Sequence, residues 1–288
     1  MTQADKAYPL VTVYMPTKNR LELLKKAVNS VYMQTYPNIE LIICNDGSTD
    51  NTEQYLKSLH PKGPVSLVST FSNTESKGAC HARNKAIKMA SGFFVTGLDD
   101  DDQFLPNRIS SLVEQYDPNF AFICSAMIWD YGKKQRVIDK KPGIFSLTSQ
   151  LSYNEATTQI LVEKDRIISV NGFDEAFVAC QDYDLWTRLM QEYGPLKRIK
   201  EPSYIINNTE TTQRMTANPK SVKGYEQFYA KHSHLMSWQN KHNQEFMKLR
   251  RQRKRYPITY FVMHLLSGHN IAKLRYLISS NSRVLYKN

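Results

Sequence analysis

Four consecutive carboxylates, Asp99 to Asp102, follow directly on the apolar run 93–98. A short run rich in aromatic and β-branched residues predicts a buried strand, and the acidic run marks its end. Adjacent carboxylates repel one another, so a chain tolerates them where they are solvated or where a cation lies among them. Asp99 and Asp101, on alternate residues, predict a site for one hard divalent cation, either jointly or with one of them taking a ligand hydroxyl. Oxygen ligands favour Mg²⁺ or Mn²⁺.

Several other polar residues can be explained by local structure as well as by a role in binding. Asp100 and Asp102 are interpreted as a solvated turn and as the N-cap of a helix that follows Pro106. Asp46 is either an Asx-turn residue or the acceptor of a hydrogen bond from a nucleobase or ribose. Arg83 lies on a predicted helix whose other face is alanine-rich, and taken alone it is interpreted as a surface charge.

The elements that position these residues alternate between strand and helix. Apolar runs predict strands at 10–16, 39–45, 65–71 and 93–98, and helical spacing predicts helices at 21–32 and 78–90 and one that contains Tyr55, Leu56 and Leu59. This alternation predicts a doubly wound, mostly parallel sheet, which binds ligands at the carboxyl ends of its strands. Loops 17–20, 46–51 and 99–102 all lie at such ends, so we expect them to converge on one crevice.

The second half of the chain is less regular. The patterns predict a helix at 107–113, a strand at 120–128, a hairpin with a basic turn at 129–141, a strand at 159–162 and a helix at 164–170. Residues 143–159 show weak periodicity. Gln181 opens a helix with Asp182 and Asp184 in its first turn, where the helix dipole favours carboxylates.

Size and composition narrow the class of protein. A chain of 288 residues can bury a core of its own. The net charge of +11 and pI near 9.3 indicate an anionic partner, which could be nucleic acid, an acidic membrane surface or a phosphorylated substrate. Four widely separated cysteines predict neither a zinc site nor a disulfide framework. We expect a cytoplasmic protein, because residues 1–9 lack a signal-peptide pattern and no apolar run is long enough to span a bilayer.

The composition changes after about residue 216, so we expect a domain at 1–216 and a helical extension at 217–288. Residues 217–247 predict one or two helices, 248–255 form the densest basic run, and 256–266 are apolar. An apolar stretch beside a basic cluster favours an anchor on an anionic membrane surface. The structural alternative is a helical cap on the domain or a contact in a homodimer.

Several motifs follow one another in a fixed order: VYMPTKNR at 13–20, ICNDGSTD at 43–50, ARN at 82–84, LDDDD at 98–102, NGFD at 171–174 and QDYDL at 181–185. Together they resemble the family 2 inverting glycosyltransferases with the GT-A fold, over about residues 8–215. The resemblance implies a hexosyltransferase-type enzyme that moves a sugar from a nucleotide donor, most often a UDP-sugar, to an acceptor hydroxyl with inversion at the anomeric carbon. It also implies a doubly wound sheet flanked by helices.

The resemblance further implies a role for each matching residue. The residues implied to bind the nucleotide donor lie in the three strand-end loops and on helix 78–90, and they are Thr17, Asn19, Asp46, Arg83, Asp99 and Asp100. Asp101 is implied to bind the metal and the diphosphate. Asp182 matches the catalytic base, which removes the proton of the acceptor hydroxyl as that oxygen attacks. The metal stabilises the departing diphosphate, where negative charge grows.

Two departures from the family pattern stand near these residues. Gln181 occupies a position where the family commonly has Glu, so the effect of a second acid on the pKa of the base is missing. Asp184 either compensates for this or caps the helix. Asn207 stands where many relatives carry a His that helps to bind metal or diphosphate, and Arg214 or His232 could take that role.

We therefore predict a metal-dependent inverting glycosyltransferase, peripheral at the cytoplasmic membrane face, that acts on a polysaccharide or a lipid-linked saccharide. Residues 143–190 are expected to form the acceptor side. Trp129, Tyr153 and Trp186 are candidate aromatic platforms for sugar stacking, and core packing is the alternative for Trp186.

Two other classes of protein share some of these features. A nucleotidyltransferase would carry a Gly-rich basic loop after the first strand, and residues 17–20 contain no Gly. A basic nucleic-acid-binding protein would explain the charge of +11, but it leaves the four consecutive carboxylates without a function. Nucleic acid is therefore not the expected partner.

Overall fold

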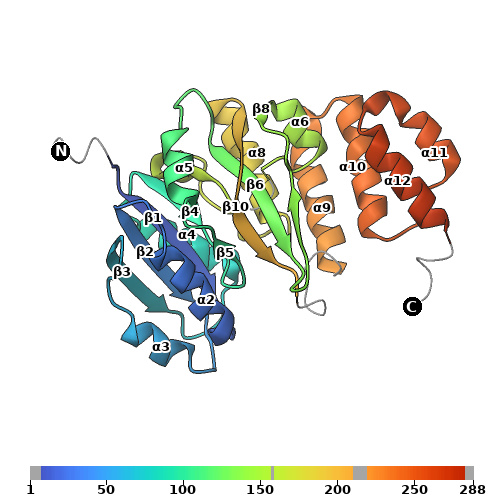
Figure 1. The fold of residues 1–288 in the computed structure, drawn as a ribbon. Coiled ribbons are helices and arrows are strands. Elements are labelled where there is room, and N and C mark those ends of the chain that lie inside the picture. The colour runs from blue at the N-terminus through green and yellow to red at the C-terminus, as the bar shows by residue number, and fades with distance from the viewer. Residues whose placement is uncertain (1–7, 157–158, 210–218, 283–288) are drawn as a thin grey trace.

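The N-terminal half of the chain forms the parallel part of one sheet, in a computed structural model that describes residues 8–156, 159–209 and 219–282. Its strands are β1 (Val11–Thr17), β2 (Ile39–Asn45), β3 (Val65–Ser72) and β4 (Phe94–Gly97), and they lie in the order β3-β2-β1-β4 (Figure 1). β1, β2 and β4 are buried along their whole length. This double-sided burial explains why their sequences are nearly continuous apolar runs.

Helices cover both faces of these strands. They are α2 (Leu21–Tyr32), α3 (Thr52–Ser58) and α4 (Ala79–Met89), whereas α5 (Arg108–Glu114) packs against β6 (Ile123–Asp130) and β10 (Leu196–Asn207). Successive residues of a strand point to opposite faces. Accordingly Val13 packs in the core layer that holds the apolar residues of α2, whereas Tyr14 packs in the layer of α4. The doubly wound arrangement expected from the sequence is confirmed for this half.

The second half of the sheet is mixed. The short strand β9 (Leu161–Glu163) runs antiparallel between β4 and β6 (Ile123–Asp130), and β10 (Leu196–Asn207) then pairs in parallel with β6. β7 (Gln135–Ile138) forms the expected hairpin with β6, while β5 (Gln103–Phe104) and β8 (Gly143–Phe145) pair antiparallel with β10. The sequence patterns predicted neither β5, β8 nor β10.

The remaining helices belong to the second half of the chain, and those from α9 onward form its C-terminal end (Figure 1). They are α6 (Leu147–Ser152), α7 (Lys164–Ser169), α8 (Gln181–Tyr193), α9 (Pro219–His232), η2 (Ser233–Leu235), α10 (Trp238–Arg251), α11 (Ile258–Met263), η3 (Leu265–Ser267) and α12 (Asn270–Asn281). The extension is helical, as expected. Its expected boundary at residue 216 lies outside the described residues.

The C-terminal helices share a core with the sheet-bearing part of the chain. The ring of Tyr183 on α8 stacks on that of Phe228 on α9, with 3.7 Å between the ring centroids. Asn240 on α10 donates to the carbonyl of Thr148 on α6 at 2.7 Å. The first two helices of the extension therefore hold the helix that carries Asp182.

Candidate active site

The loops after β1 and β2 lie against each other at the carboxyl ends of their strands. The backbone N–H of Asn19 donates to Oγ of Ser48 at 2.9 Å, and the N–H of Thr49 donates to Oδ1 of Asn19 at 2.7 Å. Asn19 has a φ of 53°, a left-handed conformation that Asn tolerates better than most residues. The hydroxyl of Thr17 donates to Asp100 at 2.8 Å, which brings in the loop after β4. The expected convergence of three loops is confirmed.

Asp46 holds a fourth segment at this edge. Its two carboxylate oxygens accept hydrogen bonds from Asn73, Ser76 and the backbone N–H groups of Lys77 and Gly78, at 2.7–2.9 Å. Burial alone would raise the pKa of Asp46, but these bonds outweigh it and lower that pKa. Asp46 is therefore ionised, and it fixes the loop that leads into α4.

Arginines neutralise the acidic run from two sides. Arg83 on α4 pairs with Asp99 at 2.7 Å, and Arg20 pairs with Asp100 at 3.2 Å and with Asp101 at 2.8 Å. The guanidinium of Arg83 also lies over the ring of Phe173, 5.4 Å from its centroid. The interpretation of Arg83 as a surface charge is wrong, because Asp99 and Phe173 enclose its side chain.

The expectation that Asp100 and Asp102 are solvated is also wrong. Asp100 is 5% exposed, and burial together with the charge of Asp101 raises its pKa to about 6. Asp102 accepts from the hydroxyl of Tyr204 at 2.9 Å and from the N–H of Asn207 at 3.0 Å. It ties the acidic run to β10 and does not cap α5, whose N-cap is Asn107.

Asp182 lies in the first turn of α8, within reach of the charges of Arg83 and Asp99. The residue before this helix, Cys180, has a left-handed φ of 61°, which turns the chain sharply into α8. Burial raises the pKa of Asp182 to about 6, although the backbone N–H of Tyr183 and the charge of Arg83 act to lower it. Asn154 donates to Oδ2 of Asp182 at 2.9 Å. The motifs did not single out Asn154.

The structure shows the contacts of Gln181 and of the residues suggested to compensate for the two departures from the family pattern. Gln181 donates to the carbonyl of Phe177 at 3.3 Å. Asp184 is fully buried and pairs with Arg188, Lys231 and His232, so it supports the packing of α9 on α8. His232 is thereby committed to Asp184, whereas Arg214 lies outside the described residues.

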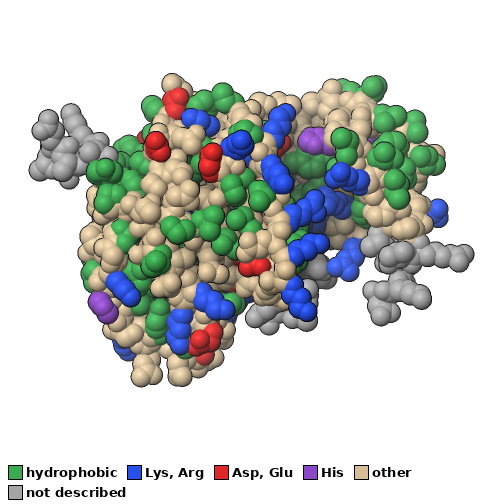
Figure 2. Space-filling view, in the orientation of Figure 1, with side chains coloured by type: hydrophobic (Ala, Val, Ile, Leu, Met, Phe, Trp, Pro, Cys, Tyr) green, Lys and Arg blue, Asp and Glu red, His purple; other side chains and the backbone are tan. Residues whose placement is uncertain are grey.

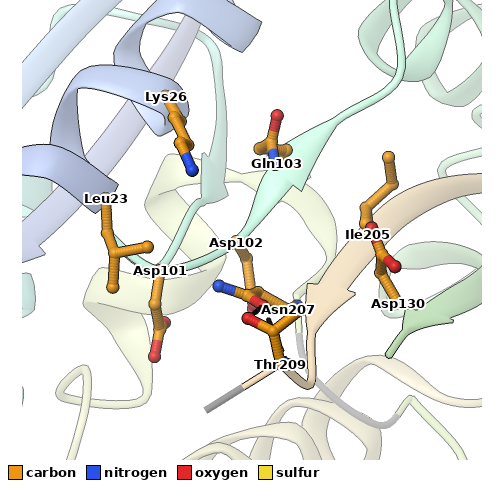
Figure 3. Close-up of a pocket in the computed structure, with 9 residues that line it drawn as sticks. All are labelled: Leu23, Lys26, Asp101, Asp102, Gln103, Asp130, Ile205, Asn207 and Thr209. Atoms are coloured by element: carbon orange, nitrogen blue, oxygen red, sulfur yellow. Dashed lines mark hydrogen bonds between the residues drawn. The ribbon is translucent and has the colours of Figure 1, made fainter. Parts of the chain in front are cut away.

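A cavity of about 120 Å³ adjoins the acidic run (Figure 3). Residues of α2, the acidic run and the ends of β6 and β10 line it, and they are Leu23, Lys26, Asp101, Asp102, Gln103, Asp130, Ile205, Asn207 and Thr209. Asn207, which occupies the position of the His found in many relatives, thus lies beside Asp101 and Asp102. Its side-chain oxygen accepts from the N–H of Thr209 at 3.0 Å.

The acidic run has the chemistry of a divalent cation site. Its donors are hard carboxylate oxygens, and like charges act with burial to raise the pKa of Asp101, a repulsion that a cation would relieve. Among the residues that the structure describes, no three His, Cys, Asp or Glu side chains are grouped to hold a metal by themselves. A Mg²⁺ or Mn²⁺ ion here would complete its shell with phosphate oxygens and water, as is usual for Mg²⁺.

The aromatic candidates differ in their surroundings. Trp186 is fully buried between Phe122 and Phe173, so its role is core packing. Trp129 is partly exposed at the end of β6 and contacts Tyr131 edge-on. Tyr153 packs against His269 with 3.9 Å between the ring centroids. Only Trp129 and Tyr153 stay candidates for contact with a sugar.

Comparison with known proteins identifies the family. The sequence profile of glycosyl transferase family 2 matches residues 12–172. WcaA of Escherichia coli K12, named as a colanic acid biosynthesis glycosyl transferase, is 30% identical over 276 residues, which cover 92% of this chain and 96% of WcaA. WfgD of Escherichia coli, named as a UDP-Glc:α-D-GlcNAc-diphosphoundecaprenol β-1,3-glucosyltransferase, is 30% identical over 190 residues, 64% of this chain and 70% of WfgD.

The fold has a solved counterpart in S. aureus TarS 1-349 in complex with UDP-GlcNAc. The TM-score is 0.57 at 18% identity, and the match covers 94% of this chain and 71% of the TarS chain. The chain therefore belongs to glycosyl transferase family 2, and its architecture is the GT-A fold. The family match favours glycosyl transfer over the nucleotidyltransferase and nucleic-acid-binding alternatives.

Proposed function

We propose that this glycosyltransferase moves a sugar from a nucleoside diphosphate donor, in the first place a UDP-sugar, to a saccharide hydroxyl with inversion at the anomeric carbon. One observation carries the proposal. Arg83 pairs with Asp99 of the acidic run at 2.7 Å, and its charge also acts to lower the pKa of Asp182, so one guanidinium serves both the acidic run and the proposed base although they lie far apart in the sequence. The UDP-GlcNAc bound to TarS, which shares the fold, supports the class of donor.

The donor would lie along the strand-end loops. Thr17, Asn19 and Asp46 hold the strand-end loops in place, and these loops would bind the uridine. Arg83 would assist them. Arg83 also has a buried Nε–H without a hydrogen-bond partner in the described part of the chain, which suits an anionic ligand. Asp99 and Asp100 would face the ribose side of the donor.

Asp101 would hold the cation beside the diphosphate. When bound, Mg²⁺ or Mn²⁺ supplies positive charge that stabilises the phosphate oxygens of the leaving group. The chain itself contributes Arg20 to the same place, because its guanidinium already pairs with Asp101. We infer that a cation bound at Asp101 would replace Arg20 as the partner of that carboxylate. Arg20 would then remain close to the diphosphate.

Asp182 would act as the general base. Its carboxylate accepts the acceptor proton while the acceptor oxygen forms a bond to the anomeric carbon, and the bond from that carbon to the diphosphate oxygen breaks with its electron pair. A base with a pKa of about 6 is ionised at neutral pH and is still basic enough to take the proton. The rate should therefore rise with pH through about 6 and then level off.

Asn154 is predicted to tune this base. Its hydrogen bond stabilises the ionised form of Asp182, so Asn154→Ala should raise the pKa of Asp182 and move the acid limb of the kcat–pH profile to higher pH. The loss of kcat at neutral pH should be about twofold, because a rise of about one pKa unit leaves roughly half of the base ionised at pH 7. A pH series of initial rates measures both effects, with the exposed Asn119→Ala as control. An unmoved acid limb would leave Asn154 with a packing role only.

The donor class can be tested by a thermal-shift screen. A ligand that binds only the folded chain raises the melting temperature, so UDP-sugars with Mn²⁺ should raise it by more than the same sugars with a chelator. GDP-sugars provide the control for the identity of the nucleobase. If only GDP-sugars raise the melting temperature, the donor carries guanosine and not uridine. If no nucleotide sugar raises it, the donor proposal is contradicted.

The acceptor is proposed to be a saccharide or a lipid-linked saccharide used in cell-surface polysaccharide synthesis. WcaA and WfgD carry names of this kind, and WfgD is named for an undecaprenol-diphosphate acceptor. A lipid-linked acceptor would place the enzyme at the cytoplasmic face of the membrane as a peripheral protein. Within the described residues, no helix combines the length and apolarity that crossing a membrane requires.

A further inference from the structure

An exposed apolar surface covers the C-terminal end of the molecule. We call it the C-terminal apolar face, and its residues come from α11, η3 and α12: Ile258, Val262, Met263, Leu265, Leu266, Ile271, Leu274 and Ile278. Leu266 is 83% exposed and Ile271 is 70% exposed. Figure 2 shows hydrophobic side chains gathered on the lobe that these helices form in Figure 1. Apolar surface this extended on a folded protein indicates an interaction site.

The apolar face is a regular feature of the helices. Ile271, Leu274 and Ile278 are spaced three and four residues apart on α12, so they lie on one side of it. Ile258 and Val262 have the same spacing on α11. An apolar stripe on each of two neighbouring short helices is typical of helices that lie in a membrane interface.

The helices do not need these residues for their own packing. Beneath the face, the fully buried ring of Tyr256 contacts those of Phe246 and Tyr276 at 5.2 Å and 6.1 Å between centroids. The buried ammonium of Lys273 donates to the carbonyls of His264 and Gly268 at 3.0 Å and 2.6 Å. These contacts are made by side chains other than those of the C-terminal apolar face, which stay exposed.

The charge of the chain identifies the partner. Residues 246–288 contain ten Lys or Arg and no Asp or Glu, so they carry +10 of the formal net charge of +11. Arg253, Lys254, Arg255 and Arg275 are exposed next to the apolar face in the sequence. A second copy of the chain would bring the same positive charge against this one, whereas an anionic surface would be attracted to it.

We propose that the C-terminal apolar face docks into the headgroup region of an anionic lipid bilayer. The apolar side chains enter the interface, and the arginines and lysines beside them bind lipid phosphates. The inference concerns attachment and does not depend on which sugar is transferred. Because α9 and α10 connect this end to α8, docking would also fix the orientation of Asp182 relative to the membrane.

Vesicle sedimentation of the full chain tests the proposal. The protein should sediment with vesicles that contain phosphatidylglycerol, less with phosphatidylcholine alone, and less again as salt is raised. Leu266→Glu/Ile271→Glu should weaken binding to the anionic vesicles by about tenfold or more. Arg253→Gln/Lys254→Gln should weaken it and reduce the salt dependence.

Matched substitutions outside the C-terminal helices serve as controls. Met33→Glu, at another highly exposed apolar position, and Lys88→Gln/Lys200→Gln should leave vesicle binding unchanged. Circular dichroism establishes that each variant is folded. Wild-type binding by Leu266→Glu/Ile271→Glu would overturn the proposal. So would a dimer in sedimentation velocity that this variant converts to monomer while vesicle binding persists, since the face would then bind a second copy.

Discussion

Replacing Asp182 by Asn is expected to lower kcat for sugar transfer by about 10²- to 10⁴-fold, the usual contribution of a positioned general base. Asn has nearly the same shape as Asp, and it can keep a hydrogen bond to Asn154, but it cannot accept the acceptor proton. The affinity for the donor should change little, because Asp182 is not among the residues proposed to bind the donor. Initial rates with a labelled nucleotide sugar measure the effect.

The neighbouring Gln181 offers the matched control for this substitution. Gln181→Ala removes a hydrogen bond to the carbonyl of Phe177 and leaves Asp182 in place, so transfer should stay within several-fold of wild type. The wild-type rate should fall as the pH drops below about 6, since the base is then protonated. Asp182→Asn should show no such acid limb. Equal rates for Asp182→Asn and wild type would show that another group takes the proton.

The largest effect on stability is expected at Asp184. Its fully buried carboxylate accepts from Arg188 at 2.7 Å, from Lys231 at 2.9 Å and from His232 at 2.8 Å. Asp184→Ala removes the buried counter-charge of Arg188 and a hydrogen-bond partner of Lys231 and His232, which should lower the free energy of unfolding by about 3–5 kcal/mol. Urea denaturation followed by circular dichroism measures the loss. Asp174→Ala, which removes a half-exposed partner of Lys231, should cost less than about 1 kcal/mol.

The pH dependence of this loss has a definite sign. Burial would raise the pKa of Asp184, but the bond to His232 and the charge of Arg188 lower it to about 2 from an ordinary value of 3.8. The carboxylate therefore stabilises the fold fully above pH 3.8, and its contribution disappears as the pH falls through about 2. The gap between wild type and Asp184→Ala should close over that range. A gap that is already small at neutral pH would contradict the assigned role.

The donor side of the site could be predicted from the sequence because it depends on strand ends. The strands β1, β2 and β4 are continuous apolar runs, and each is followed at once by polar residues. Parallel strands place such residues at one edge. The positions of Thr17, Asn19 and Asp99 therefore followed from the order of the elements, with no knowledge of packing.

The burial of Asp100 and Asp102 could not be predicted in the same way. Asp100 is buried against Thr17 at the end of β1 and against Arg20 in the loop that follows. Asp102 is buried against Tyr204 and Asn207 at the end of β10, about a hundred residues further along the chain. The pattern of β10 is hidden by charged residues and by Pro202, where the pairing with β6 shifts register. Without β10 there was no partner for Asp102, and solvent was the default environment.

The contacts of Asn154 and Arg83 could not be predicted for a related reason. Asn154 lies in a stretch of weak periodicity, and only the packing of α6 against α8 brings it to Asp182. Arg83 is flanked on its helix by small residues, but Asp99 and Phe173 come from two other segments to enclose it. Contacts between segments that are distant in sequence decide both roles, and local patterns carry no signal for them.

Donor titration by calorimetry, in the presence of Mn²⁺, tests most directly whether the acidic run holds the donor while Asp182 performs the chemistry. Wild type and Asp182→Asn should bind the UDP-sugar with the same Kd, although Asp182→Asn no longer transfers it. Asp101→Asn should bind it about tenfold or more weakly and lose the response to Mn²⁺. Equal donor binding by Asp101→Asn and wild type, or weaker binding by Asp182→Asn alone, would contradict this division of roles.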